Sequence, residues 1–135
     1  MVKSLWINLP VSNIANSKRF YSAIGFSFNE QQETADSACM LVGDSNTVVM
    51  LFSTSTFEGF TQNTIPASGT EVLLSIDVQS RDDLDAVTQR ARAAGAEIFA
   101  EPSEVMGWMY GSGFSDPDGH RWNLLFMDMS KMPQQ

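Results

Sequence analysis

The chain has 135 residues, of which 43% are hydrophobic, and this is enough for one ordinary domain with a core. Its formal net charge of −8, from 16 acidic and 8 basic side chains, argues against a nucleic-acid partner, because such a partner requires a basic surface that displaces counterions from phosphates. The single cysteine forms no internal disulfide, which fits a reducing compartment. No stretch approaches the roughly 18 apolar residues of a membrane span, and the apolar run before Pro10 is too short for a signal peptide. We therefore expect a soluble cytoplasmic protein with no membrane partner.

The first predicted unit is a strand followed by a helix. Residues 4–11, SLWINLPV, alternate between two faces. One face is wholly apolar and should pack under the helix: Leu5, Ile7, Leu9 and Val11. The other face is mixed: Trp6, Asn8 and Pro10. Ser12 or Asn13 is placed to cap a helix that runs to about Ile24, Gly25 favours its end, and the strand-like runs FSFNEQQ, ACMLVG and TVVMLF follow.

The second predicted unit repeats this order. Residues 71–78, EVLLSIDV, alternate in the same way. Their apolar face comprises Val72, Leu74, Ile76 and Val78, and their mixed face comprises Leu73, Ser75 and Asp77. Ser80 and Asp83 have the spacing of a capping box, and Gly95 ends the predicted helix as Gly25 ends the first. The runs AEIFAE, WMYGSGF and HRWNLLFM then predict three more strands.

Both halves therefore read β-α-β-β-β, with a repeat of about 67 residues that is typical of a duplicated module. We place the first module at about 1–54, a Ser, Thr and Gly-rich linker with one helical turn at about 55–69, and the second module at about 70–128. Since neither half can bury its sheet alone, we predict that they pair into one domain over residues 1–135. The mixed faces are then the concave, partly solvated surface on which a ligand binds.

Two sequence stretches resemble a known family. They are LPVSNIANSKRFYSAIGF near the start and FSDPDGHRW near the end, and with the paired module pattern they resemble the vicinal oxygen chelate superfamily. This superfamily includes glyoxalase I, bleomycin-resistance proteins, fosfomycin-resistance proteins and extradiol dioxygenases. NLPV, MYG, DPDGHRW and the terminal MD are most similar to the bacterial group of predicted lactoylglutathione lyases. The resemblance implies an α+β fold in which two βαβββ modules curl a mixed sheet around a cleft, in a homodimer.

The resemblance also implies where a metal ion would bind. Metal-using members draw one ligand from the first and one from the last strand of each module. Here those positions hold Trp6, Met50 (or Val49 if the register slips by one), Leu73 and Asn123. Trp and Leu bind no metal, Met is a soft ligand suited to copper, and a neutral Asn amide replaces a carboxylate poorly on the divalent ions used in this family. We therefore expect no metal and no other cofactor.

The only histidine follows a turn signature. DPDG has the residue order of a type I turn, and His120 comes directly after it. Two interpretations are open: His120 is a general acid or base, or it starts the last strand and hydrogen-bonds to the turn. We favour the second. Alternation then places Arg121, Asn123 and Leu125 toward the cleft, and Trp122 and Leu124 toward the helix.

The candidate ligand-binding residues share a predicted position in the cleft: Trp6, Asn8, Met50, Phe52, Leu73, Ser75, Trp108, Tyr110, Arg121 and Asn123. The polar members either orient a ligand or satisfy one another in a polar network. The aromatic members either form an apolar wall or belong to the core. Gly107, Gly111 and Gly113 mark strand curvature, a bulge or the close approach of a ligand.

Three functions fit these observations. The favoured one is a protein like the bleomycin-resistance proteins, which binds a small organic molecule in the cleft without a metal. The first alternative is a metal-dependent enzyme, either a lyase or isomerase of the glyoxalase I type or a dioxygenase, with a divalent ion held by residues not identified here. The second alternative is a non-catalytic subunit with a vestigial cleft.

Overall fold

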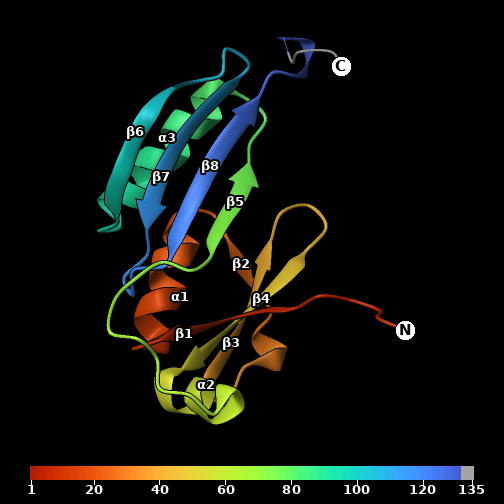
Figure 1. Ribbon diagram of the computed structural model, residues 1–135, viewed down its shortest axis with the longest axis vertical. Helices are drawn as coiled ribbons and strands as arrows, with labels where there is room; N and C mark the ends of the chain where they lie inside the picture. The colour runs from red at the N-terminus through yellow and green to blue at the C-terminus, as the bar shows by residue number, and fades with distance from the viewer. Residues whose placement is uncertain (132–135) are drawn as a thin grey trace. The chain divides into compact units, whose positions relative to one another are not determined.

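The computed structural model describes residues 1–131 and contains two compact units. The first unit comprises Met1–Gly69, and the second begins at Thr70. Each unit has one four-stranded mixed sheet, and the strands are coloured along the chain in Figure 1. No helix in residues 1–131 is long and apolar enough to span a membrane.

The first unit has the β-α-β-β-β order with a second helix after it. Its elements are β1 (Ile7–Val11), α1 (Ile14–Ala23), β2 (Ser27–Phe28), the short 3₁₀ helix η1 (Glu30–Gln32), β3 (Ser37–Val42), β4 (Thr47–Ser53) and α2 (Thr54–Thr61). The sheet order is β1-β4-β3-β2, with β1 parallel to β4 and the other pairs antiparallel. This order confirms the predicted module.

The second unit repeats the pattern. Its elements are β5 (Leu73–Asp77), α3 (Arg81–Ala93), β6 (Glu97–Val105), β7 (Met109–Ser115), β8 (Arg121–Met127) and the 3₁₀ helix η2 (Met129–Lys131). The sheet order is β5-β8-β7-β6, again with one parallel pair, β5 and β8. In Figure 1 α3 lies behind this sheet and covers one of its faces. The two units thus share one topology, as the sequence repeat predicts.

The predicted helix ends are confirmed in both units. Asn13 Oδ1 accepts a hydrogen bond from the Asn16 backbone N–H at 2.9 Å, and Ser80 Oγ accepts one from the Asp83 N–H at 3.0 Å. Each cap satisfies a backbone donor that the first helical turn leaves without a partner. Gly25 and Gly95 follow the two helices with φ of +108° and +96°, a conformation that only glycine adopts without strain.

Alternation along the strands also holds where the strands are buried. The core of the first unit packs α1 against its sheet through Leu9, Val11, Phe20, Tyr21, Ile24, Val49 and Leu51. The core of the second unit packs α3 against its sheet through Leu84, Thr88, Ala91, Phe114, Trp122 and Leu124. Leu5 is an exception, because β1 begins only at Ile7 and leaves Leu5 exposed.

The predicted linker is more ordered than expected. Instead of one helical turn within residues 55–69, α2 runs over Thr54–Thr61 directly after β4. Thr54 Oγ1 donates to the Val11 carbonyl at 3.3 Å, and the Phe60 ring packs edge-to-face on Phe52 with 5.0 Å between centroids. The Ser and Thr residues suggested a loop, whereas the contacts of Thr54 and Phe60 with the sheet favour a helix.

Candidate functional site

The second unit has a sheet face opposite α3, which we call its open face. The strand register defines it as three rows: Leu73, Arg121 and Ser115; Ser75, Asn123 and Gly113; and Asp77, Leu125 and Gly111. The side chains of Trp122 and Leu124, one position along, are buried on the α3 side. The prediction that Arg121, Asn123 and Leu125 share a face away from the helix is therefore confirmed.

Arg121 is held on the open face by an aromatic ring. Its guanidinium carbon lies 4.3 Å from the centroid of the Phe99 ring. The same ring covers Gly113 so closely that a Cβ at that position would lie 2.4 Å from it. The missing side chain of Gly113 thus makes room for Phe99, and Phe99 supports Arg121 by a cation–π contact. The register of β6 with β7 shifts on either side of the Ala100–Gly113 pair, as the bulge explanation predicts, and the group that approaches Gly113 is an aromatic side chain of the same unit rather than a ligand.

Two neutral polar residues are adjacent in the next row. Ser75 on β5 lies directly opposite Asn123 on β8. Among residues 1–131, neither side chain hydrogen-bonds to another, so they do not form a closed polar network. Their donors and acceptors are free for solvent or a ligand.

The first unit has the same register on its own open face. Asn8 lies opposite Met50, and Met50 lies opposite Cys39 on the next strand. Phe52 lies on this face too, where the Phe60 ring of α2 packs against it. Burial raises the pKa of the Cys39 thiol, and the negative charge of Glu33 raises it further, so this buried thiol is less easily ionised than an exposed one.

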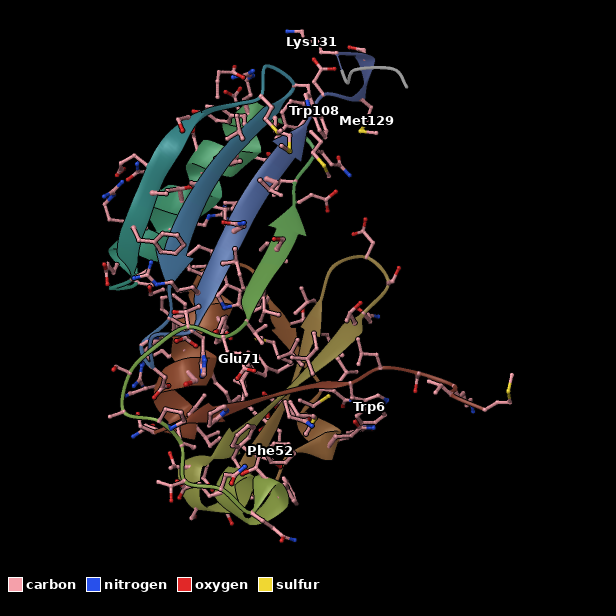
Figure 2. All side chains as sticks on the ribbon, in the orientation of Figure 1. Trp6, Phe52, Glu71, Trp108, Met129 and Lys131 are labelled. Atoms are coloured by element: carbon pink, nitrogen blue, oxygen red, sulfur yellow. The ribbon has the colours of Figure 1, made fainter. Side chains whose placement is uncertain are left out.

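Trp6 is not part of this face. It precedes β1, is 59% exposed, and its indole N–H donates to Ser4 Oγ at 3.2 Å. Figure 2 shows it on the extended segment that leads into β1. Because β1 begins at Ile7 and the predicted strand began at Ser4, Trp6 lies outside the sheet.

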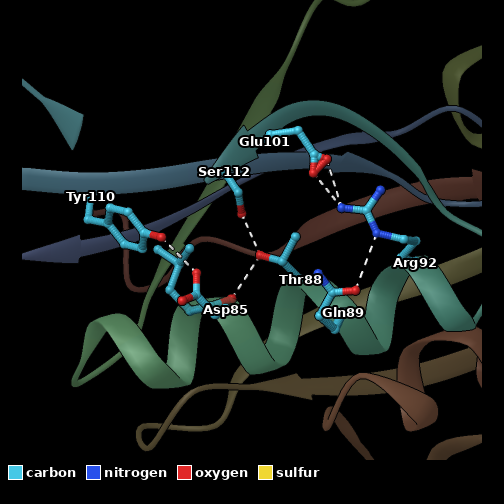
Figure 3. Close-up of polar contacts among 8 residues, drawn as sticks. Asp85, Thr88, Gln89, Arg92, Glu101, Tyr110 and Ser112 are labelled. Atoms are coloured by element: carbon cyan, nitrogen blue, oxygen red, sulfur yellow. Dashed lines mark hydrogen bonds and ion pairs between the residues drawn. The ribbon is translucent and has the colours of Figure 1, made fainter. Parts of the chain in front are cut away.

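Tyr110 and Trp108 lie elsewhere than predicted. Tyr110 shares the α3 side of β7 with Ser112 and Phe114, and its hydroxyl donates to Asp85 Oδ1 at 2.8 Å (Figure 3). Trp108 precedes β7 in the β6–β7 hairpin, where its carbonyl accepts from the Asp128 N–H at 2.8 Å. Placing Tyr110 on the open face was wrong, because position 110 alternates with the open-face glycines, whereas Trp108 precedes β7 and strand alternation does not place it on either face.

The hydrogen bond to Asp85 raises the pKa of the Tyr110 hydroxyl above its ordinary value. Burial and the Asp85 charge raise it further, while the cation of Arg81, 4.7 Å from the ring centroid, lowers it. Tyr110 is therefore a protonated hydrogen-bond donor that links β7 to α3. It has no contact with the open face.

His120 belongs to the turn that starts β8. The Gly119 N–H donates to the Asp116 carbonyl at 3.0 Å, as in a type I turn, and Gly119 has a φ of +88°. The carboxylate of Asp116, which is buried, accepts from the N–H groups of Asp118 and His120 at 3.0 and 2.8 Å. His120 thus hydrogen-bonds to the turn as the favoured interpretation predicted.

The residues at the expected metal positions do not fit a hard divalent ion. In residues 1–131 no three His, Cys, Asp or Glu side chains gather in a way that could hold a metal. Asn8 with Met50, and Ser75 with Asn123, occupy equivalent rows of the two units, and Leu73 offers no lone pair. Such ligands are neutral or soft, whereas Zn²⁺, Mn²⁺ and Fe²⁺ favour imidazole and carboxylate.

The sequence reasoning missed Phe99 on the open face. Its run, AEIFAE, predicted a strand, and β6 does form there. However, β6 pairs with β7 through register shifts between Glu97 and Ala100 and between Ala100 and Ser103. Because of these irregularities, alternation does not predict the direction of the Phe99 side chain. The available signal was an aromatic residue on one strand and a glycine on the strand that pairs with it.

Known proteins resemble this chain over almost its whole length. A model of the Glyoxalase/Bleomycin resistance protein/Dioxygenase superfamily matches residues 3–124. A hypothetical protein from S. aureus is 30% identical, with a TM-score of 0.86, and the match covers 93% of this chain and 95% of that one. A search of curated proteins finds no match.

Two solved structures of lower identity share the fold. A glyoxalase/bleomycin resistance protein/dioxygenase family enzyme from Burkholderia phytofirmans PsJN is 21% identical, with a TM-score of 0.80 over 90% of this chain and 96% of that one. The fosfomycin resistance protein FosX from Mesorhizobium loti is 14% identical, with a TM-score of 0.70 over 97% of this chain and 98% of that one. Both agree with two βαβββ units. The chain belongs to the Glyoxalase/Bleomycin resistance protein/Dioxygenase superfamily.

Proposed function

We propose that the chain binds a small organic molecule on the open faces of its sheets and that binding requires no metal ion. The observation that carries the proposal is the side-chain chemistry of the equivalent rows. Where the family resemblance places metal ligands, the chain has Met50 and Asn123, with Asn8 and Ser75 beside them. These side chains are suited to hydrogen bonds and apolar contact with an organic ligand.

The availability of the polar groups supports the proposal. The side chains of Asn8, Ser75 and Asn123 hydrogen-bond to no other residue in the described part of the chain. Groups that only stabilise a fold are normally paired with one another when they are withdrawn from water. A polar group that recognises a ligand gives up its hydrogen bonds to water and forms hydrogen bonds to the ligand instead. These new bonds give specificity.

The decisive experiment combines elemental analysis with ligand screening. We expect the purified protein to hold no stoichiometric metal, with or without added Ni²⁺, Zn²⁺, Mn²⁺ or Fe²⁺. We also expect members of a panel of small organic molecules to raise the melting temperature, because a ligand that binds only the folded state stabilises it. One tightly bound divalent ion per chain, lost to a chelator, would instead establish the metal-dependent lyase, isomerase or dioxygenase.

A matched pair of variants tests the location of binding. Asn123→Leu removes the amide at the row shared with Ser75 and keeps the side-chain volume. Gln89→Leu makes a similar change on the exposed surface of α3. The proposal requires that only the first variant loses the ligand-dependent rise in melting temperature. If no ligand stabilises the wild type and no metal is retained, the vestigial-cleft alternative is correct.

We also propose that the protein is a homodimer in the cytoplasm, as the family resemblance implies. Large apolar side chains exposed on the second unit are available for burial in a dimer interface, among them Val72, Met106 and Met129. Light scattering coupled to size-exclusion chromatography should then give twice the chain mass of 14.9 kDa. A single-chain mass at micromolar concentration would contradict the dimer and leave the binding proposal unaffected.

A further inference from the structure

The open face of the second unit has a cation, Arg121, that forms no ion pair with a carboxylate of residues 1–131. In the described residues, the side chain of Arg121 makes only the contact with the Phe99 ring, at 4.3 Å from the centroid. The other arginines on this unit differ: Arg81 pairs with Glu104, Arg92 pairs with Glu101, and Arg90 is exposed on α3. An arginine that is held in place but not paired needs an explanation.

The stack beneath Arg121 fixes its position. Gly113 lets the Phe99 ring lie close to the backbone of β7, and the ring in turn contacts the guanidinium. A cation–π contact uses no N–H group of the guanidinium in a hydrogen bond, so all five donors stay available. Holding the side chain in advance also lowers the entropy that a ligand must overcome on binding.

Three acidic residues lie on or near the open face, and none of them pairs with the Arg121 guanidinium in residues 1–131. Glu97 lies in the row of Ser115 and Arg121, two strands away on β6, and Glu71 precedes β5. Asp77 is on the same face at the row of Leu125. All three are exposed and none forms an ion pair with Arg121 in residues 1–131.

We infer that Arg121 binds a carboxylate group of the ligand, with the body of the ligand extending over Asn123 and Ser75. The inference rests on the proposed function and adds the class of ligand to it. A guanidinium presents two parallel N–H groups that match the two oxygens of a carboxylate. Phe99, which covers Gly113 in this row, and Leu125 in the next row suit a ligand with an apolar body. Because the net charge of the chain is −8, this recognition depends on direct contact rather than on long-range attraction.

The experiment uses three probes of nearly equal shape: benzoate, benzamide and benzylamine. Backbone amide NMR locates each probe on the wild-type chain, and the titration gives its dissociation constant. We expect benzoate to shift the resonances of residues 121–125 and 73–77 and to bind about tenfold more tightly than benzamide, with benzylamine weakest. Arg121→Gln should reduce benzoate affinity to that of benzamide, and Arg121→Lys should recover only part of it, because lysine lacks the paired donors.

Two further variants separate recognition from folding. Arg90→Gln removes the same charge from the exposed surface of α3 and should leave benzoate binding unchanged. Phe99→Leu removes the ring but keeps Arg121, and should weaken benzoate more than benzamide. Equal binding of benzoate and benzamide, benzoate binding that survives Arg121→Gln, or no benzoate shifts on this face each overturns the inference. Failure of the proposed function is distinct, since then no probe of any charge shifts either open face.

Discussion

The two units have one topology but use their sheets differently. In the first, α2 follows β4 and its Phe60 ring packs on Phe52, so an aromatic pair occupies part of the open face. In the second, the residue after the last strand leads to η2, and the open face retains Arg121 and Asn123. A duplicated module can therefore keep its register while one copy has more polar side chains on its open face.

The helix sides of the two units differ as well. Phe20 and Tyr21 of α1 pack edge-to-face, and the buried Ser17 hydroxyl of the same helix has no hydrogen-bond partner among residues 1–131. In α3, the buried Thr88 hydroxyl donates to the Leu84 carbonyl at 2.7 Å and lies 2.8 Å from Ser112 Oγ (Figure 3). The first unit thus relies on aromatic packing, whereas the second adds a satisfied polar contact between helix and sheet.

The largest expected effect tests whether equivalent core positions in the two units contribute equally to the free energy of unfolding. Leu51 on β4 and Leu124 on β8 follow the equivalent residues Met50 and Asn123, and both are fully buried. We expect Leu51→Ala and Leu124→Ala each to lower the free energy of unfolding by about 2–5 kcal/mol, measured by urea denaturation. Leu73→Ala is the control, because Leu73 is 48% exposed and its truncation should cost less than about 0.5 kcal/mol. A loss confined to one of the two buried sites would break the equivalence of the units.

The next effect concerns the glycine beneath Phe99. Gly113→Ala places a Cβ against the ring, so Phe99 must move, and we expect a loss of about 1–3 kcal/mol in the free energy of unfolding. Gly59→Ala in α2 meets no atom within 4 Å and should stabilise the chain by about 0.5–1 kcal/mol.

A double variant shows whether the ring is the cause of the Gly113 effect. If it is, Gly113→Ala should cost much less when Phe99 is already alanine. Additive losses from the two changes would mean that Gly113 is needed for the backbone of β7, and the support of Arg121 by Phe99 would then need another basis.

Removing a buried hydroxyl should change the free energy of unfolding in opposite directions in the two units. Thr88→Val leaves the Ser112 hydroxyl without its partner, and we expect a loss of about 1–3 kcal/mol in the free energy of unfolding. Ser17→Ala removes a hydroxyl that has no partner in the described chain and improves helix propensity, so a gain of up to about 1 kcal/mol is expected. Thermal and urea denaturation measure both. Losses of similar size from both variants would show that Ser17 is hydrogen-bonded in solution and would remove this difference between the units.

Local signals in the sequence were sufficient for much of the fold. Asn13, Ser80, Gly25 and Gly95 act through backbone groups within a few residues of them, so the helix ends were predictable. The alternation of Trp122, Asn123 and Leu124 was predictable for the same reason, since one strand determines it.

Features that depend on pairing between strands were not predictable. The sides of Tyr110 and Phe99 follow from the registers of β7 with β8 and β6, and the latter includes two shifts. A one-residue change in register moves a side chain to the other face. The support of Arg121 by Phe99 therefore became visible only with the paired sheet, whereas Arg121 itself was already a candidate.

The smallest expected effect concerns the hydrogen bond from Tyr110 on β7 to Asp85 on α3 in the second unit. Asp85 raises the pKa of Tyr110, so the folded chain favours the neutral phenol more than the unfolded chain does. This contribution to stability is complete below the unfolded pKa of about 10 and is lost as the pH rises through the folded pKa. Tyr110→Phe should therefore weaken the decline of stability in alkaline solution, measured by urea denaturation across that range.

Asp85→Asn isolates the cause of the shift. It removes the carboxylate that holds the phenol proton, so the titration midpoint of Tyr110 should fall toward the ordinary tyrosine value. The chain has two tyrosines, and the absorbance titration of Tyr110→Phe supplies the contribution of Tyr21 for subtraction. Asp82→Asn, one turn earlier on the exposed side of α3, is the control for net charge. If Asp82→Asn lowers the midpoint as much as Asp85→Asn does, general charge rather than the hydrogen bond determines the pKa of Tyr110.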